Sequence, residues 1–240
     1  ATVNHYFPTS HLAYACVVSA LGKLNPARAV APPGLGNGAI AIGYKEGRNG
    51  KPTVQYEIMV TSLGGTADHD GTPMVMGICH FTPSTPVEIV ETEYPIRIRK
   101  FDIWEDSGGA GRTRGGIGFV REYEMLTDVM LTARTANHKQ AGWGVEGGEA
   151  PPVCITSINP DGPDRVELAA LDTREAFAGT VVRLEQTGGS GYGTPMERDP
   201  GQVLEDVRNG YVSAAAAVAK YGVVIAGGEI DEAETARQRS

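Results

Sequence analysis

The chain has 240 residues, of which 41% are hydrophobic and 21% charged, a composition typical of soluble globular proteins with one large or two small domains. The formal net charge of −8 and the lack of a basic run argue against a nucleic-acid-binding protein. No apolar stretch approaches the roughly 20 residues that a membrane-spanning helix needs. The 32 glycines and 15 prolines instead indicate many turns and short strands.

The N-terminal residues and the cysteines bear on the compartment. The first residues have no basic start, so they do not resemble a secretory signal peptide. Cys16, Cys79 and Cys154 are far apart and form no CxxC pair. Reduced, buried thiols in a cytoplasmic protein are the favoured interpretation, with a metal-binding or nucleophilic cysteine as the alternative.

The predicted elements begin with a helix over residues 10–24, whose apolar residues recur at helical spacing and whose start Ser10 can cap. Asn25–Pro26 is expected to end this helix, because the residue before a proline disfavours helical geometry. Two strands follow at 38–44 and 52–60, and a polar turn with two glycines joins them.

The next segment mixes loop and short elements. Residues 62–73 are expected to form a long exposed loop, since they carry few apolar side chains. Residues 74–79 are a candidate buried strand. Residues 86–95 fit a helix or a strand, and the spacing of their glutamates favours a short helix.

From residue 96 onward the sequence has the pattern of an antiparallel meander or sandwich. Strands are expected at 96–104, 116–126, 128–135, 153–158, 165–169 and 180–187. Helices are expected at 201–211, 212–222 and 229–240, with Gly210 and Gly222 as terminators. We therefore predict an α+β fold in one region spanning 1–240. Its β-rich antiparallel core covers about 38–187, with an N-terminal helix and a C-terminal helical segment at about 199–240.

The first glycine-rich motif is DSGGAGRTRGG at 106–116. Its backbone N–H groups could cradle an anion together with Arg112 and Arg114, which are candidate substrate-binding residues. The alternative is a tight turn between strands, with arginines that pair with acids of a neighbouring subunit. The motif is not a P-loop, because no Gly-Lys-Ser/Thr follows.

The second motif, GGSGYG at 188–193, precedes a polar segment that contains Arg198. Tyr192 could donate a hydrogen bond in a substrate pocket lined by Gly191 and Gly193, with Arg198 nearby. The alternative is a close-packed crossing of a loop over a sheet, which also requires glycine. Asp199–Pro200 is expected to begin the next helix.

Histidines and carboxylates offer a third set of candidates. His69, Asp70 and His80 are candidates for acid–base chemistry or metal binding, against solvated loop groups and a core or interface histidine. His5 and His11 are expected at the surface. Trp143, next to glycines, is expected to be an exposed aromatic that a partner covers.

Three blocks together resemble the hydantoinase B/oxoprolinase family, which includes one of the subunits of the acetone carboxylases. They are residues 84–103, the segment DSGGAGRTRGGIGFVREYE at 106–124, and the glycine loop at 188–200 with the helical residues 203–225. The resemblance is to the C-terminal half of the family, with Ser190 where a glycine is usual. The half that resembles a metal site has no counterpart, which suggests a split subunit or a processed fragment.

The resemblance implies a subunit of a heteromeric ATP-dependent cyclic-amide hydrolase of the hydantoinase or oxoprolinase type, which completes the substrate pocket and the subunit interface. The alternatives are a subunit of an ATP-dependent ketone carboxylase and a purely structural assembly subunit. No cofactor is expected on this chain alone; ATP with Mg and a divalent Zn or Mn are expected in partner subunits. The expected partners are a hydantoinase A-like ATP-binding subunit, a chain that supplies the missing N-terminal half, and a small carbonyl substrate, with no nucleic acid and no membrane.

Overall fold

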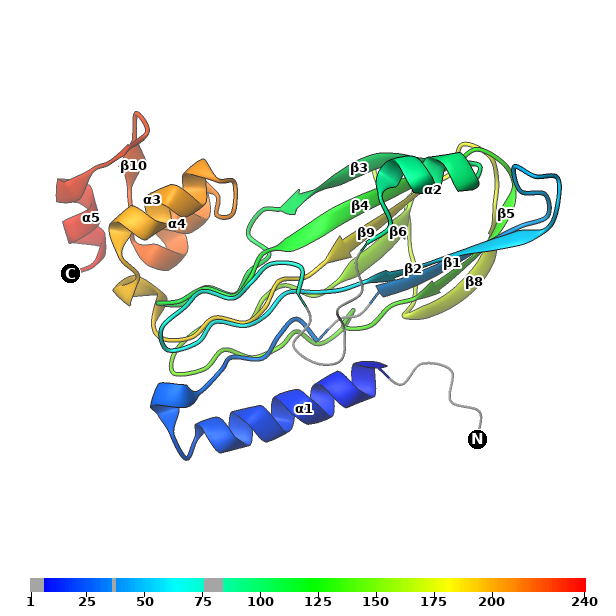
Figure 1. Cartoon of the computed structure of the whole chain (residues 1–240). Coiled ribbons are helices and arrows are strands. Elements are labelled where there is room, and N and C mark those ends of the chain that lie inside the picture. The colour runs from blue at the N-terminus through cyan, green and yellow to red at the C-terminus, as the bar shows by residue number, and fades with distance from the viewer. Residues whose placement is uncertain (1–6, 36–37, 76–83) are drawn as a thin grey trace.

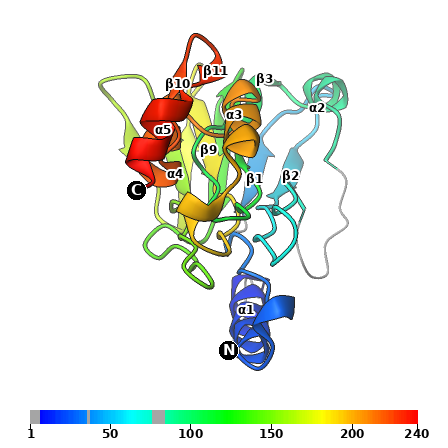
Figure 2. The same cartoon turned by 90° about the vertical axis from the view of Figure 1, so that its left-hand side faces the viewer.

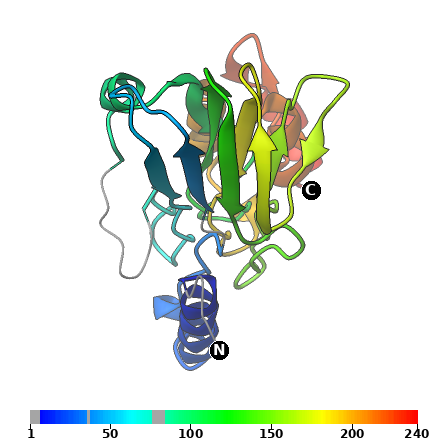
Figure 3. The ribbon, with the colours of Figure 1, turned by 90° about the vertical axis from the view of Figure 1, so that its right-hand side faces the viewer.

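A computed structural model of the chain describes residues 7–35, 38–75 and 84–240. Two antiparallel sheets pack against each other as a sandwich (Figure 3), and the C-terminal helices lie beyond one end of it (Figure 1). The predicted α+β fold with a β-rich core, an N-terminal helix and C-terminal helices is confirmed.

The first sheet has four strands in the order β2-β1-β5-β8. Their bounds are Gly38–Tyr44 (β1), Thr53–Met59 (β2), Val129–Arg134 (β5) and Leu171–Ala176 (β8). The second sheet has five strands in the order β3-β4-β9-β6-β7. Their bounds are Ile96–Trp104 (β3), Gly118–Met125 (β4), Ile155–Ile158 (β6), Val166–Glu167 (β7) and Val181–Gln186 (β9). Every recorded pair of neighbouring strands is antiparallel.

Alternate residues of each strand fill the space between the sheets, because successive side chains point to opposite faces. Ile40 and Leu131 from the first sheet and Tyr123 and Leu184 from the second are fully buried in one cluster. Residues that pair directly across two strands point to the same face of the sheet. Thr156 pairs with Leu184, so it also faces inward.

Helices surround the sandwich at three places. They are α1 (Phe7–Gly22) followed by the short η1 (Pro26–Arg28), α2 (Val87–Glu93) beside β3, and a C-terminal group. The C-terminal group contains η2 (Pro195–Glu197), α3 (Pro200–Arg208), α4 (Ala214–Tyr221), the hairpin β10 (Ile225–Ala226) and β11 (Glu229–Ile230), and α5 (Glu232–Gln238). Figure 2 shows this group in front, with α1 separate below it. None of the helices in the described part of the chain is long and apolar enough to cross a bilayer.

Local signals set the ends of the C-terminal helices as predicted. The Asp199 carboxylate accepts a hydrogen bond from the backbone N–H of Gln202 at the start of α3, and Pro200 is the first helical residue. Gly222 ends α4 in the left-handed conformation, with φ of 64°. These helices bury their own apolar cluster, which includes Val203 and Tyr221.

The N-terminal helix differs from the prediction in its start and in the face it buries. It begins at Phe7, so Ser10 lies inside it and does not cap it. His11 and Ala15 are buried against the loops, which makes the expectation of a surface His11 wrong. Cys16 follows the buried Ala15 but is itself exposed, so it is not the buried thiol that was expected. Cys154 is buried, as predicted.

Other differences concern short or polar elements. The sequence pattern did not predict β8, because its four central residues are polar and all but Ala176 are exposed or partly exposed at a sheet edge. The strand expected at 165–169 is only Val166–Glu167. Most of the strand expected at 74–79 lies outside the described residues, as do Cys79, His80 and His5.

Candidate functional site

Glycine-rich loops lie between the sandwich and the C-terminal helices, and they run side by side as extended chain (Figure 1). We call the four loops 61–65, 107–118, 142–149 and 187–193 the glycine layer. Backbone hydrogen bonds tie them together: Gly65 N–H donates to the Ser190 carbonyl and Gly109 N–H to the Gly189 carbonyl, each at 2.8 Å. Residues 61–65 are therefore mostly buried, and the expectation of an exposed loop is wrong for this part.

Glycine is required because the backbones of the layer are in direct contact. A Cβ on Gly115 would lie 1.8 Å from the Gly189 carbonyl oxygen, and one on Gly191 would lie 2.0 Å from the Ala110 carbonyl oxygen. Gly193 has a φ of +72°, which side-chain-bearing residues rarely adopt. These contacts favour the close-packed crossing of loops over a direct contact of Gly191 with a ligand.

Tyr192 lies within the layer. It is 5% exposed, and its hydroxyl donates to the Pro26 carbonyl at 2.9 Å, which joins the loop to η1. The Arg112 guanidinium lies 5.9 Å from the ring centroid. The donor that the sequence suggested for a substrate is therefore bound within the chain, and a substrate role for Tyr192 stays a prediction.

Two of the predicted arginines meet two carboxylates in a cluster between the layer and α3, in which all members but Asp70 are buried. Arg198 donates to both Asp70 oxygens, at 2.7 and 2.8 Å, and to Asp206 at 2.8 Å. Arg114 donates through Nε to the other Asp206 oxygen at 2.9 Å. We call Asp70, Arg114, Arg198 and Asp206 the ion cluster.

The ion cluster balances its own charge, with two cations and two anions. Burial raises the pKa of Asp70, but the hydrogen bonds and the positive charge of Arg198 outweigh it and hold the pKa below its ordinary value. Asp70 is thus ionised and paired at neutral pH, which favours a structural role over the suggested acid–base role. Arg114 pairs with an acid of its own chain rather than one of a neighbouring subunit.

Beside the cluster, His69 and Arg112 are exposed. Arg112 donates from Nη2 to the Ala67 carbonyl at 3.2 Å, and its guanidinium also lies by the Tyr192 ring. Among the predicted site residues that the structure describes, these two are exposed and Asp70 is partly exposed. Within the described part of the chain, no three His, Cys, Asp or Glu side chains gather as a metal site would require.

Trp143 also has a partner inside the chain. Its indole N–H donates to the Ser19 hydroxyl of α1 at 3.1 Å, and the ring is half-buried. The expectation that Trp143 is exposed until a partner covers it is therefore wrong in part, because α1 of the same chain already contacts the indole.

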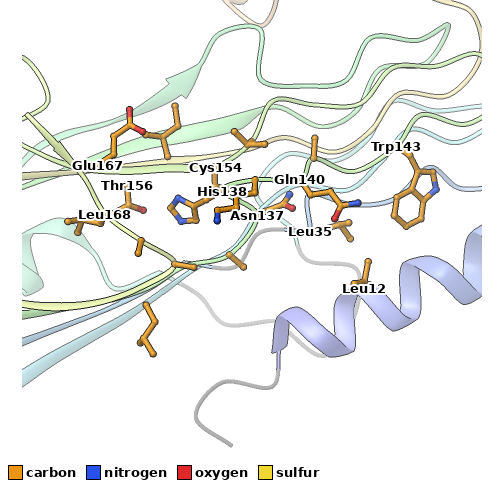
Figure 4. A pocket seen from close by; sticks show the side chains of 18 residues that line it. Leu12, Leu35, Asn137, His138, Gln140, Trp143, Cys154, Thr156, Glu167 and Leu168 are labelled. Carbon is orange, nitrogen blue, oxygen red and sulfur yellow. The ribbon is translucent and has the colours of Figure 1, made fainter.

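A large pocket lies at one end of the sandwich, next to α1, and has a volume of about 860 Å³ (Figure 4). This volume falls in the range of about 300–1,000 Å³ that is common for small-molecule sites. Leu12 and Trp143 line one side and Leu168 the other. The wall is mainly apolar, and the charged side chains that line it among the described residues, Lys139 and Glu167, are exposed.

A few polar groups interrupt this apolar wall. The Thr156 hydroxyl and the Asn137 side-chain nitrogen Nδ2 are buried and have no hydrogen-bond partner among the described residues. His138 Nε2 lies 2.5 Å from the Thr135 hydroxyl, and burial lowers the pKa of its imidazole. Burial raises the pKa of the Cys154 thiol to about 12, so this thiol is protonated and is not a nucleophile at neutral pH.

Sequence reasoning missed Asn137 and Thr156 because no local pattern marks them. Asn137 lies in the crossing from β5 towards β6, and Thr156 lies on β6. Asn137 has a φ of 67°, which asparagine tolerates better than most residues, but this conformation leaves no signature in the sequence.

The sandwich and its pocket define a β-rich protein with a site of the size that small ligands occupy. A sequence model described as hydantoinase B/oxoprolinase matches residues 1–195. The chain therefore belongs to the hydantoinase B/oxoprolinase family, and the resemblance seen in its glycine-rich motifs is confirmed.

Named relatives agree with this assignment. The chain is 32% identical over 215 residues to the B component of a putative D-/L-hydantoinase of Pseudomonas sp. (strain NS671), covering 89% of this chain and 36% of the relative. It is 32% identical over 236 residues to the beta chain of the caprolactamase of Pseudomonas jessenii, covering 92% and 40%. The chain thus spans well under half of the length of either relative.

Solved structures show the same fold. The ATP-dependent caprolactamase from Pseudomonas jessenii aligns with a TM-score of 0.79 at 32% identity, over 92% of this chain and 40% of that chain. The nucleotide-free acetone carboxylase aligns with a TM-score of 0.73 at 24% identity, over 92% and 34%. The acetone carboxylase likeness is evidence of the fold alone.

Proposed function

We propose that the chain is one subunit of a heteromeric ATP-dependent cyclic-amide hydrolase and supplies a wall of the substrate pocket and part of the subunit interface. The observation that carries this proposal is the likeness to caprolactamase, which extends over 92% of the chain in both sequence and fold. The likeness to a hydantoinase component supports the same class of reaction.

The proposal assigns the rest of the enzyme to other polypeptide segments. Because the chain spans 36% to 40% of these relatives, we expect a further chain or segment with the remainder of the hydantoinase B-like unit. We also expect a hydantoinase A-like ATP-binding subunit. ATP with Mg and a divalent metal such as Zn or Mn belong to those parts in this proposal, since Asp70 and Asp206 are already paired with arginines.

The residues of this chain contribute by position rather than by proton transfer. In the proposed reaction ATP supplies phosphorylation, which makes a stable amide reactive. The apolar wall around Leu168 and Cys154 would exclude water from the ring during that step, and an excluded-water site strengthens polar contacts to the reacting group. The ion cluster and the glycine layer would hold this wall at a fixed distance from α3.

Two alternatives remain open. A role in a ketone carboxylase is supported by 27% identity over 228 residues to the acetone carboxylase alpha subunit of Xanthobacter autotrophicus. A purely structural role is supported by the internal pairing of Arg114, Arg198 and Tyr192.

The test is the activity of the complex purified through this chain. It would be supplied with ATP and, in turn, ε-caprolactam, hydantoin, 5-oxoproline or acetone, with and without bicarbonate, and scored for ring opening and phosphate release. Our proposal predicts ATP-dependent ring opening that needs no bicarbonate. Phosphate release only with acetone and bicarbonate would reject it in favour of the carboxylase.

A further inference from the structure

We infer that the outward face of α1 binds a helix of the polypeptide that carries the rest of the hydantoinase B-like unit. The identity of this occupant rests on the proposed function, whereas the position of the surface rests on the composition and exposure of α1. Four exposed residues share this face, and we call them the α1 stripe: Ala13, Val17, Ala20 and Leu24.

The first argument is the composition of α1. Its 16 residues include no Lys, Arg, Asp or Glu, so it lacks the charged side chains that normally face water on a surface helix. One face already packs against the chain, where His11, Ala15 and Gly22 are buried. A helix that is apolar on all sides is normally buried on all sides. The outward face is therefore expected to be covered as well.

The second argument is the exposure of large apolar side chains on that face. Val17 is 59% exposed and Leu24 is 83% exposed, and the neighbouring Leu21 is 59% exposed. In Figures 1 and 2, α1 lies at the lower edge of the molecule, and the other described elements lie above or beside it. Contiguous exposed apolar side chains of this kind mark a surface for protein contact.

The third argument is the spacing of the α1 stripe, which points to a helix as the binding element. Its members recur at intervals of four, three and four residues, the spacing of the contact line between two packed helices. The turn after α1 continues this line, because the Leu24 N–H donates to the Leu21 carbonyl at 3.0 Å. Ala13 and Ala20 are small, so a second helix can approach closely between Val17 and Leu24.

The size of the α1 stripe excludes a simple pair of copies of this chain. The stripe is about 17 Å long at 1.5 Å per residue, and a helix is about 10 Å across, so its footprint is on the order of 200 Å². A stable interface takes roughly 800 Å² from each partner. Two copies joined through α1 alone therefore fall short, and the occupant must also cover surface beside the helix.

The rest of the hydantoinase B-like unit has the size that this requires. The match to the hydantoinase B/oxoprolinase model extends over residues 1–195, so α1 belongs to the family unit. The chain covers 36% and 40% of two relatives, so the part of each relative outside the alignment is larger than this chain. Such a polypeptide can place one helix on the α1 stripe and further residues around it.

The experiment compares two double variants that each introduce two carboxylates. Val17→Glu with Leu24→Glu alters the α1 stripe, on the helix and in the turn after it. The control is Ile89→Glu with Phe177→Glu, at residues that are 51% and 63% exposed, on α2 and in the turn between β8 and β9. In Figures 1 and 2, α2 lies on the opposite side of the molecule from α1.

Each variant is purified through a tag on this chain, and the components are quantified by peptide mass spectrometry. In the stripe variant we expect the recovery of the polypeptide with the rest of the unit to fall at least tenfold, because its binding would bury unpaired carboxylates. The control should recover it at the wild-type level. Circular dichroism of the recovered tagged chain checks that the stripe variant is folded.

A second measurement identifies the occupant without adding charge. The photo-crosslinker p-benzoylphenylalanine replaces Leu24, whose exposure lets the fold accept the larger ring, and in a control chain it replaces Phe177. After irradiation of the assembly, we expect position 24 to be joined to the polypeptide with the rest of the hydantoinase B-like unit, and position 177 to be joined to no other chain.

Each outcome decides one claim. Full recovery of that polypeptide by the stripe variant, or a wild-type chain that purifies alone, overturns the inference. A cross-link from position 24 to a second copy of this chain or to the ATP-binding subunit overturns the assigned occupant, as does no cross-link in an intact assembly, even if the complex opens cyclic amides. The expected cross-link in an assembly without ATP-dependent ring opening keeps the inference and rejects the proposed function. If the stripe variant does not fold, the cross-link from position 24 decides.

Discussion

Removal of Arg198 tests the role of the ion cluster. Arg198 is 2% exposed, and its side chain forms ion pairs with both carboxylates, Asp70 on the loop and Asp206 on α3. Its Nη1 also donates to the Arg112 carbonyl at 3.1 Å. Arg198→Met keeps much of the apolar length of the side chain and removes the charge and all of these bonds.

The size of the effect follows from what the two carboxylates retain. Removing one partner of a buried ion pair costs about 3–5 kcal/mol, because a charge is left buried and unpaired. Asp206 keeps its bond to the Arg114 side chain, and Asp70 keeps the bond from the Arg114 backbone N–H at 2.9 Å. The Asp70 side chain is also 32% exposed, so water can partly replace the lost partner. We therefore expect a loss of about 3 kcal/mol in the free energy of unfolding, at the low end of that range.

The assay is thermal and denaturant unfolding of the purified protein. For a chain of this size, about 3 kcal/mol corresponds to a fall in melting temperature of roughly 10 °C. The control is Arg237→Met on α5, whose partner Glu234 forms an exposed i,i+3 pair, and there we expect a change of less than about 0.5 kcal/mol. A loss for Arg198→Met no larger than that of the control would refute the account of the ion cluster.

Three further predictions concern pH, packing and reactivity. The folded-state pKa of Asp70 lies below its ordinary 3.8, so the pairing stabilises the fold above pH 3.8, and this stabilisation is lost as the pH falls through the folded-state pKa. Asp70→Asn should therefore flatten the fall of stability below pH 3.8, as measured in acid titrations followed by circular dichroism. Gly115→Ala should prevent folding or sharply lower the yield of soluble protein, since the new Cβ would lie 1.8 Å from a backbone oxygen. The control Gly43→Ala, whose Cβ would have its nearest atoms at 3.7 Å, should fold. Equal yields of the two variants would contradict the packing argument. Iodoacetamide should modify the exposed Cys16 and leave Cys154 unmodified in the native state, as read by peptide mass spectrometry, and rapid native labelling of Cys154 would count against its burial.

Sequence reasoning succeeded where structure depends on local signals. Strand periodicity located β3, β4 and β9, and the Asp199–Pro200 pair located the start of α3. Each of these signals lies within one element and needs no knowledge of distant neighbours.

Distant contacts account for what the sequence did not reveal. The buried loop 61–65 depends on glycines in other loops, so its polarity suggested exposure. The pairing of Asp70 with Arg198 joins positions 128 residues apart, and no spacing rule connects them. The pocket containing Asn137 and Thr156 arises where the crossing chain meets the end of β6, which is a property of topology.

The most direct test of the central claim is native mass spectrometry of the assembly purified through a tag on this chain, with every component identified by peptide sequencing. Our account predicts a heteromer that contains a hydantoinase A-like ATP-binding subunit and a polypeptide with the rest of the hydantoinase B-like unit. A lone chain or an assembly of identical copies would contradict it.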